Sequence, residues 1–469
     1  MDSEFLQYEL DYYPVSIYQF MCVPLALIFY HLSITGHLSL TARYIFLLFG
    51  GSLMAVVSMG PYAMLVLLPA VLSMILIHSL EPRSVHRWTF LTQMTWLTLC
   101  HLWLHYKEYY LQEAADIKYS IALSSLMLLT QRITSTSLDI HEGKITTPIR
   151  IMQQNHLEYE LLHSFLSYLS YMLNFPALFG GPLFTFKMFK THMENLKRAD
   201  RKCITSPLWP FVKKCILFLL LSKLRIFVRN SIRDQGPLQW NAPIDILLIW
   251  ITALMFRLAY YSQWLLNESL NHLIGLGLEN TKSEKTTLSD TDIWTLETTT
   301  QISVFARTWN KTTADWLRRI VFQQCKVQPL LATFAFSAWW HGLHPGQIFG
   351  FILWALAIQA DYHIHRHVDS LIVRSRLLRF FYRPVAWLQT QLVIAYILVA
   401  VELRSFTCVL LLSMGPASSN PWGTPPIAGL QPEKQPFATT FCFEANSVFS
   451  QHVLVKGLTC NSLLLPCAH

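Results

Sequence analysis

The chain has 469 residues, of which 53% are hydrophobic and only 14% are charged, and its formal net charge is +8. Ordinary soluble domains carry roughly 25% charged residues, so this composition argues against a water-soluble protein. The basic balance does not indicate nucleic-acid binding, because the lysines and arginines lie mainly in loops between apolar segments, where membrane topology favours them.

Apolar segments recur along most of the chain, and a bilayer core is spanned by a helix of about 20 mostly apolar residues. The segments fall at 15–33, 43–59, 61–79, 88–105, 117–131, 160–181, 208–228, 243–265, 329–341, 346–361 and 388–414. The pattern predicts an all-α, polytopic membrane protein with about eleven transmembrane or re-entrant helices. The N-terminus is acidic rather than basic, so we expect no cleavable signal peptide and an uncleaved first span.

The longest loops differ in character. The basic run 187–202, "KMFKTHMENLKRADRK", predicts a cytosolic loop by the positive-inside tendency, and binding of a phosphate-rich ligand such as coenzyme A is the alternative. The polar insertion 266–328 ends in "TTADWLRRIVFQQ", which resembles an amphipathic helix at the membrane surface or against the bundle. There, Thr312 with Asp315 resembles a capping box, and Trp316 begins the apolar face.

The nine cysteines form no CxxC pair and no regular spacing, so we expect neither a disulfide framework nor a metal site. His101 and His105 are spaced i, i+4 in "CHLWLHYKEYY", a pattern that favours interfacial packing with the neighbouring tyrosines over a metal site. GxSxG, P-loop and GxGxxG motifs are absent from the sequence, which removes the usual support for a soluble hydrolase or a nucleotide hydrolase.

His341 is the first candidate for chemistry. It lies in "FAFSAWWHGLHPG", between an apolar run and a break predicted at Gly342 and Pro345. An ionisable side chain in a membrane span is costly and so indicates function by default. Neutral imidazole is available as a general base near neutral pH. Catalysis or ligand binding and a structural, hydrogen-bonding role both remain open for this histidine.

Asn310 is the second candidate, in "FARTWNKTT" directly before the predicted amphipathic helix. Its amide is suited to donate to a developing oxyanion. The alternatives are a cap or turn at the helix start, and a glycosylation sequon in Asn310-Lys311-Thr312. A second sequon begins at Asn267.

Three stretches taken together, "NFPALFGGPLF", "TWNKTTADWLRR" and "FSAWWHGLHPG", resemble the membrane-bound O-acyltransferase family. That family's pattern is a WN-type asparagine followed by a membrane-embedded WHG-type histidine. The resemblance implies that Asn310 and His341 are catalytic, that residues 1–415 form the acyltransferase domain, and that the helices surround a central catalytic cavity.

Further stretches, including "SLDIHEGK", "YYSQWLLNESL" and "TQLVIAYILVAVELRS", are similar to a branch of the family that acts in the endoplasmic reticulum membrane. That branch moves octanoate from acyl-CoA to a serine near the N-terminus of the peptide precursor proghrelin. The likeness implies octanoyl-CoA as co-substrate with no bound cofactor, and a proghrelin-like peptide as partner. Residues 416–469 depart from the branch and are expected to form an atypical, Pro-rich, irregular tail.

The implied reaction is acyl transfer from a thioester to an alcohol, with His341 as the base. Asn310 is implied to hold the donor or the acceptor or to stabilise the oxyanion, and these roles stay open. Because no acidic residue nearby completes a triad, direct transfer without an acyl-enzyme is the simpler hypothesis.

Candidate substrate-binding residues follow from the same resemblance. The aromatic candidates for an acyl pocket are Phe334, Trp339, Trp340 and Trp354, with Trp309 beside Asn310. The candidates for the phosphates of coenzyme A are Arg307, Lys311, Arg318 and Arg319. Ordinary helix packing and interfacial charge are the respective alternatives. For the whole chain, the alternatives are acylation of a lysophospholipid or another secreted protein, or a transporter or receptor with a structural histidine.

Overall fold

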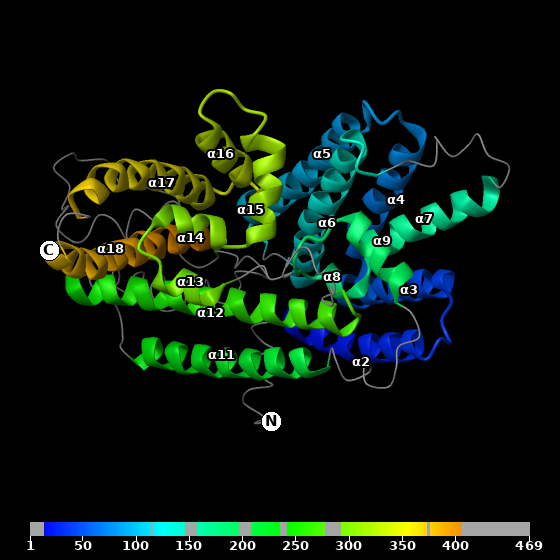
Figure 1. Ribbon diagram of the computed structural model, residues 1–469, viewed down its shortest axis with the longest axis horizontal. Coiled ribbons are helices and arrows are strands. Elements are labelled where there is room, and N and C mark those ends of the chain that lie inside the picture. The colour runs from blue at the N-terminus through cyan, green and yellow to red at the C-terminus, as the bar shows by residue number, and fades with distance from the viewer. Residues whose placement is uncertain are drawn as a thin grey trace, which may run out of the picture.

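The computed structural model describes residues 14–113, 116–145, 157–196, 208–234, 242–276, 292–372 and 376–404 (Figure 1). All regular elements within these ranges are helices. They are α2 (Pro14–Ile34), α3 (Leu40–Met59), α4 (Met64–Ser79), α5 (Val85–His105), α6 (Ile117–His141), α7 (Leu157–Leu173), α8 (Phe175–Leu178), α9 (Phe186–Asn195), α11 (Leu208–Asp234), α12 (Ala242–Leu273), α13 (Ile293–Thr298), α14 (Ile302–Thr308), α15 (Lys311–Leu317), α16 (Pro329–His341), α17 (Pro345–Ile372) and α18 (Arg376–Leu403). A short 3₁₀ helix (Gly60–Ala63) precedes α4, and two π-helical turns, Tyr106–Tyr110 and Arg318–Phe322, extend α5 and α15.

Every predicted apolar segment coincides with helix where the structure describes it, although several boundaries differ. Helix α17 continues beyond the predicted end at 361 to Ile372, and the predicted segment 160–181 is broken at Asn174, which caps α8. Residues 405–414 of the last segment, the predicted tail 416–469, and residues 197–202 of the basic loop lie outside the described residues.

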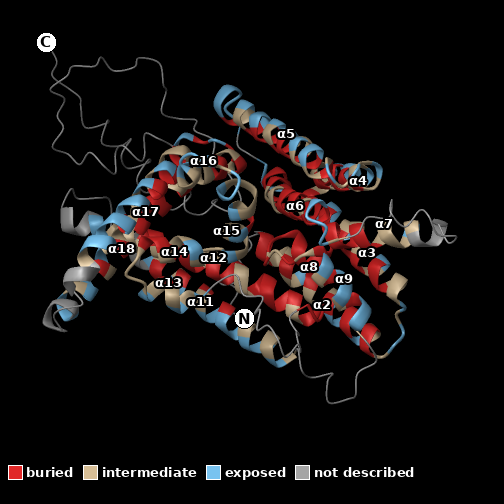
Figure 2. Ribbon diagram, turned by 45° about the horizontal axis from the view of Figure 1, so that its top comes forward, coloured by how far each residue is buried: buried red, intermediate tan, exposed pale blue. Residues whose placement is uncertain are grey.

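The outer surface is apolar. Within the described ranges, four stretches are long and apolar enough to cross a membrane: Val15–Ile34, Leu40–Ser79, Ile246–Leu273 and Phe380–Glu402. Large apolar side chains on these and neighbouring helices are exposed, including Phe49 at 68% and Phe227 at 69%. Figure 2 shows exposed residues along the outer helices. Apolar patches of this extent are rare on soluble monomers and are suited to lipid. The molecule is an all-α, polytopic membrane protein.

The buried apolar residues form two clusters. The N-terminal core joins α2–α9 and includes Trp316 of α15 and Trp340 of α16. The C-terminal core joins α12, α14, α17 and α18 and includes Ala338 of α16. Helix α16 therefore contributes to both clusters, and Figure 1 places it with α15 between the α5–α6 pair and the α17–α18 pair.

Helix α6 is buried along most of its length, although its second half, "QRITSTSLDIH", is polar. The prediction ended this segment at residue 131, so the buried polar continuation was missed. Hydroxyl groups in this half bond to carbonyls of the preceding turn, as Thr134 Oγ1 does to Thr130 O at 2.7 Å and Thr136 Oγ1 to Arg132 O at 2.8 Å. Burial is tolerated because the helix itself satisfies these polar groups.

Arg132, also on α6, supports the break between α7 and α8. Its guanidinium is buried and donates to Met172 O at 3.0 Å and to Ala177 O. Asn174 Oδ1 accepts from Ala177 N at 3.1 Å, as an N-cap does. Backbone groups exposed by the break are thus bonded inside the protein, as non-helical backbone at membrane depth requires.

Candidate active site

His341 is the last residue of α16, where the chain turns into α17. The predicted break is confirmed: Gly342 has φ +111°, in the left-handed region, and caps the helix. The imidazole stacks on Phe351 of α17, with ring centroids 5.1 Å apart and planes 29° from parallel, and contacts the Trp340 ring edge-on at 4.7 Å. The imidazole is thus held at a helix end among aromatic rings.

Asn310 occupies the position before α15 with φ +49°, a left-handed conformation that asparagine tolerates better than most residues. Its side chain makes no capping hydrogen bond to α15, so the amide is not used in the role that asparagine commonly has at a helix start. The predicted capping box is wrong, because α15 begins at Lys311 and the Thr312 hydroxyl accepts from Leu183 N at 3.0 Å instead.

A series of aromatic rings connects the neighbour of Asn310 to His341. Trp309 stacks on Phe305 at 5.5 Å, Phe305 lies 6.4 Å from Trp354, and Trp354 stacks on Phe351 at 6.5 Å. Phe351 then stacks on His341. Packed apolar rings of α14 and α17 therefore link the neighbour of Asn310 to His341.

The predicted pocket residues divide between the two faces of α16. Phe334 joins the ring series, with its centroid 5.8 Å from Trp354. Trp339 and Trp340 turn to the N-terminal core: Trp339 Nε1 donates to Thr98 Oγ1 of α5 at 2.9 Å, and the Trp340 ring lies 5.3 Å from Trp316. The structure thus brings together Trp309, Phe334 and Trp354, but not Trp339 or Trp340.

Three aromatic residues of α12 were missed by the sequence argument. Tyr260, Tyr261 and Trp264 surround Trp309, with ring centroids 5.4, 6.0 and 5.0 Å away. Tyr260 also donates to Glu402 Oε1 of α18 at 2.6 Å. Their signal was the aromatic cluster "YYSQW", but nothing local in the sequence indicates contact with Trp309.

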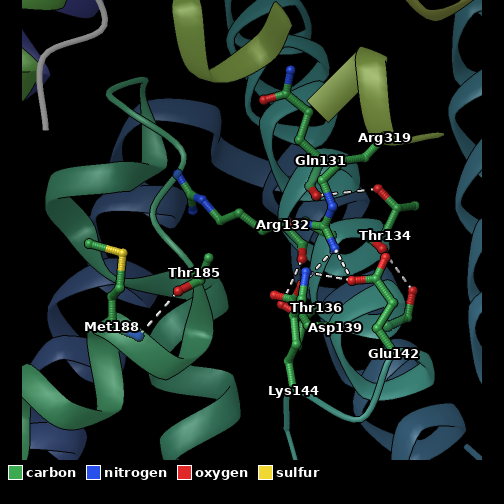
Figure 3. A network of polar contacts seen from close by, with 12 residues as sticks. Gln131, Arg132, Thr134, Thr136, Asp139, Glu142, Lys144, Thr185, Met188 and Arg319 are labelled. Carbon is green, nitrogen blue, oxygen red and sulfur yellow. Dashed lines mark hydrogen bonds and ion pairs between the residues drawn. The ribbon is translucent and has the colours of Figure 1, made fainter. Parts of the chain in front are cut away.

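The basic residues predicted to bind coenzyme A lie in different surroundings. Arg307 is exposed and donates to the Tyr362 hydroxyl of α17 at 3.0 Å. Arg319 instead turns back to α6 and pairs with Asp139 at 2.7 Å and Glu142 at 3.2 Å (Figure 3). Partial burial raises the pKa of the Glu142 carboxyl, but Lys144 and Arg319 outweigh that effect and hold this pKa below its usual range. Arg319 therefore has carboxylate partners already and fixes its segment against α6.

The sequon at Asn267 is not a glycan site in this fold. Asn267 is 1% exposed, and its Oδ1 accepts from Gln19 Nε2 of α2 at 2.7 Å. A Cβ at Gly180 would lie 2.1 Å from Asn267 Nδ2, so the loop before α9 also packs directly on this side chain.

Histidines of α5 approach the other side of the α16–α17 turn. His101 Nε2 lies 3.2 Å from Trp340 O, and His105 Nε2 lies 2.5 Å from Gly342 O. Both residues were expected to pack with neighbouring tyrosines, and His105 does stack on Tyr109 at 5.5 Å. The contacts with residues 340–342 were not foreseen, since the partners are distant in sequence.

Residues 83–399 match the model of the membrane-bound O-acyltransferase family. The chain belongs to this family. It is 47% identical over 398 residues to membrane-bound ghrelin O-acyltransferase MBOAT4 of Rattus norvegicus, covering 84% of this chain and 91% of that protein. The corresponding Mus musculus protein is 46% identical over 404 residues, with the same coverage. Membrane-bound glycerophospholipid O-acyltransferase 2 of Homo sapiens is 27% identical over 383 residues, or 76% of this chain and 72% of that protein.

Proposed function

We propose that this chain transfers an octanoyl group from octanoyl-CoA to a serine hydroxyl near the N-terminus of a proghrelin-like peptide, in the endoplasmic reticulum membrane. The names of the rat and mouse relatives support the choice of peptide. The observation that carries the proposal is the ring series from Trp309 to His341, because it links the neighbour of Asn310 to His341 through apolar side chains, the chemistry that an acyl chain needs.

In the proposed reaction, neutral His341 takes the proton from the serine hydroxyl while the serine oxygen attacks the thioester carbonyl. A positioned base of this kind contributes typically ~10²–10⁴ in rate. The tetrahedral intermediate collapses as the carbon–sulfur bond breaks, and the proton held by the imidazole passes to the departing thiolate. The products are the serine ester and free coenzyme A, so the histidine returns to its neutral form.

Asn310 is proposed to donate its amide N–H to the oxyanion that forms on the thioester carbonyl. Its position at a chain reversal, with the side chain free of a capping bond, supports this role. Loss of one oxyanion donor costs roughly 10²–10³ in rate. Arg307, exposed at the end of α14, is proposed to meet a phosphate of coenzyme A, since guanidinium groups bind phosphate oxygens through several donors.

The acyl chain is proposed to lie against Phe334, Phe351 and Trp354. Phe334 lies on α16, and Phe351 and Trp354 lie on the adjacent α17. Their ring centroids lie within 6.5 Å of one another. A rigid aromatic boundary of this kind limits the length of chain that fits, because well-packed interiors do not expand to admit added methylene groups.

A lysophospholipid is the main competing acceptor, because the human glycerophospholipid relative also matches most of the chain. A transporter or receptor is disfavoured by membership of an acyltransferase family. The identity of the acyl acceptor, peptide or lysophospholipid, therefore distinguishes the remaining hypotheses.

In the test, membranes that contain the protein are incubated with labelled octanoyl-CoA and one of three acceptors. These are an N-terminal proghrelin peptide, the same peptide with its acceptor serine replaced by alanine, and a lysophospholipid. We expect label on the serine peptide and not on the alanine peptide. Label on the lysophospholipid alone would refute the proposed acceptor while leaving the reaction class intact.

A further inference from the structure

One face of α5 and its π-helical extension meets the turn that carries His341. His101, His105 and Tyr109 follow each other at four-residue intervals and so share one side of the helix. His101 meets the carbonyl of Trp340 and His105 that of Gly342. Tyr109 completes the row, with its hydroxyl 3.5 Å from His344 Nδ1.

These bonds reach the two carbonyls that flank His341. Helix C-termini leave their last carbonyl groups without partners inside the helix, and histidine side chains are suited to bond them. At the end of α16, the backbone N–H of Gly342 bonds Trp339 O at 3.1 Å and that of Leu343 bonds Ala338 O at 2.9 Å. The side chains of α5 bond two further acceptors of the turn, Trp340 O and Gly342 O.

The acceptors require a proton on Nε2 of both histidines, because a carbonyl oxygen only accepts. His101 is 5% exposed, and its Nδ1 has no hydrogen-bond partner among the described residues. It faces Gly342 so closely that a Cβ there would lie 2.5 Å from it. The imidazole is thus packed against the residue after His341 as well as bonded to the residue before it.

We propose that His101 and His105 are positioning residues for His341: by donating from Nε2 to Trp340 O and Gly342 O, they hold the peptide unit directly before the general base and the Gly342–Leu343 unit that follows it in the turn. The inference rests on the proposed function, since it assigns these residues a part in the same acyl transfer. Neither side chain is required to touch the substrates.

A positioning role has a distinctive kinetic result. Misplacement of a catalytic group by about 1 Å costs on the order of 10² in rate. The rings proposed to bind the acyl chain lie on the opposite side of α16 from α5, so substitutions at the two histidines leave those rings in place. Loss of the two bonds is therefore expected to lower kcat while leaving the KM for octanoyl-CoA nearly unchanged.

The experiment compares glutamine and methionine at each histidine. Glutamine and methionine have similar volumes, but only glutamine retains an N–H donor at the reach of Nε2. The variants His101→Met, His105→Met, His101→Gln and His105→Gln are measured in membranes by initial rates of peptide octanoylation, normalised to the amount of folded protein. His78→Met is the control, because His78 is half-buried like His105 and bonds a helix carbonyl, Met74 O at 2.8 Å, but on α4.

We expect kcat to fall about 10- to 100-fold in both methionine variants, and each glutamine variant to recover to within about threefold of wild type. His78→Met is expected to keep wild-type kcat. Wild-type kcat in His105→Met, or equal losses in the glutamine and methionine variants, would overturn the inference. His105 is only partly buried, so His105→Met preserves the test if His101→Met does not fold. Failure of the wild type itself to acylate the peptide would instead refute the proposed function.

Discussion

His341 and Asn310 lie where helices end or begin, so each side chain leaves the backbone at a change of chain direction. The sequence indicates both residues through the family pattern, but it leaves open whether Asn310 caps its helix. The structure answers that point, since the side chain makes no capping bond. The left-handed backbone also explains why asparagine is well suited to this position, because most other residues are strained there.

The donor role of Asn310 is testable with Asn310→Asp, which keeps the size and the tolerance of a left-handed backbone but removes the N–H donor. We expect octanoyl transfer to fall about 10²- to 10³-fold. Gln328→Ala is the matched control, because Gln328 also precedes a helix with φ +52° but is exposed. Equal activities of Asn310→Asp and Gln328→Ala in initial-rate assays would exclude the proposed donor.

The proposal that the ring series limits the length of the acyl chain is testable with two phenylalanines of one helix. Phe334 and Phe336 are two residues apart on α16, but Phe334 packs in the C-terminal core and Phe336 in the N-terminal core. Replacement of a buried Phe by alanine costs about 3–5 kcal/mol of stability, so Phe336, which is the more buried of the two, controls for destabilisation. We expect Phe334→Ala alone to shift the preferred donor towards acyl-CoA longer than octanoyl-CoA, measured by competition between donors. The same shift in Phe336→Ala would contradict the placement of the acyl chain.

At the scale of the helices, the apolar pattern predicts where the elements lie, and tertiary contacts decide their ends. The polar half of α6 was missed because its hydroxyls are satisfied within the helix and not by water. The capping box at Thr312 failed because that hydroxyl bonds Leu183 N from another part of the chain. The roles of His101 and His105 depend on partners that are remote in sequence, which spacing alone does not reveal.

The segment that follows Asn310 is held on α6 by Arg319. Its ion pair with Asp139, which is 5% exposed at the side chain, is expected to matter more than a surface pair. Arg319→Ala is therefore expected to destabilise the protein by about 1.5–3 kcal/mol, measured by thermal unfolding in detergent. Arg318→Ala, at the exposed neighbouring residue, is expected to change stability by less than about 0.5 kcal/mol. Equal losses of stability in Arg319→Ala and Arg318→Ala would refute this role of Arg319.

For the whole molecule, α16 contributes to both cores, as α12 also does, and α16 ends at the proposed base. The sequence predicts the membrane class, the helical fold and the family pattern, because these depend on composition and local motifs. It does not predict which aromatic residues of α16 face which core, since that depends on how α5, α15 and α17 pack around the helix. Phe334 and Trp339 are the clearest example.

The proposed domain boundary predicts that residues 416–469 are dispensable for chemistry. The family match ends at residue 399, and the aromatic series of the candidate site lies between Phe305 and Trp354. A chain ending at residue 415 is therefore expected to octanoylate the peptide at a rate within about threefold of the full chain, a difference of less than ~1 kcal/mol in barrier. Loss of transfer in this shortened chain, with folded protein present, would show that the acyltransferase domain extends further.

The central claim is that His341 is the base that activates the serine. Its most direct test is the mass of the peptide after incubation with octanoyl-CoA and purified wild-type, His341→Ala or His341→Gln protein. We predict that the wild type adds one octanoyl group to the serine, and that both variants remain folded but are slower by at least about 10². A His341→Ala protein that octanoylates the serine at the wild-type rate would contradict the account.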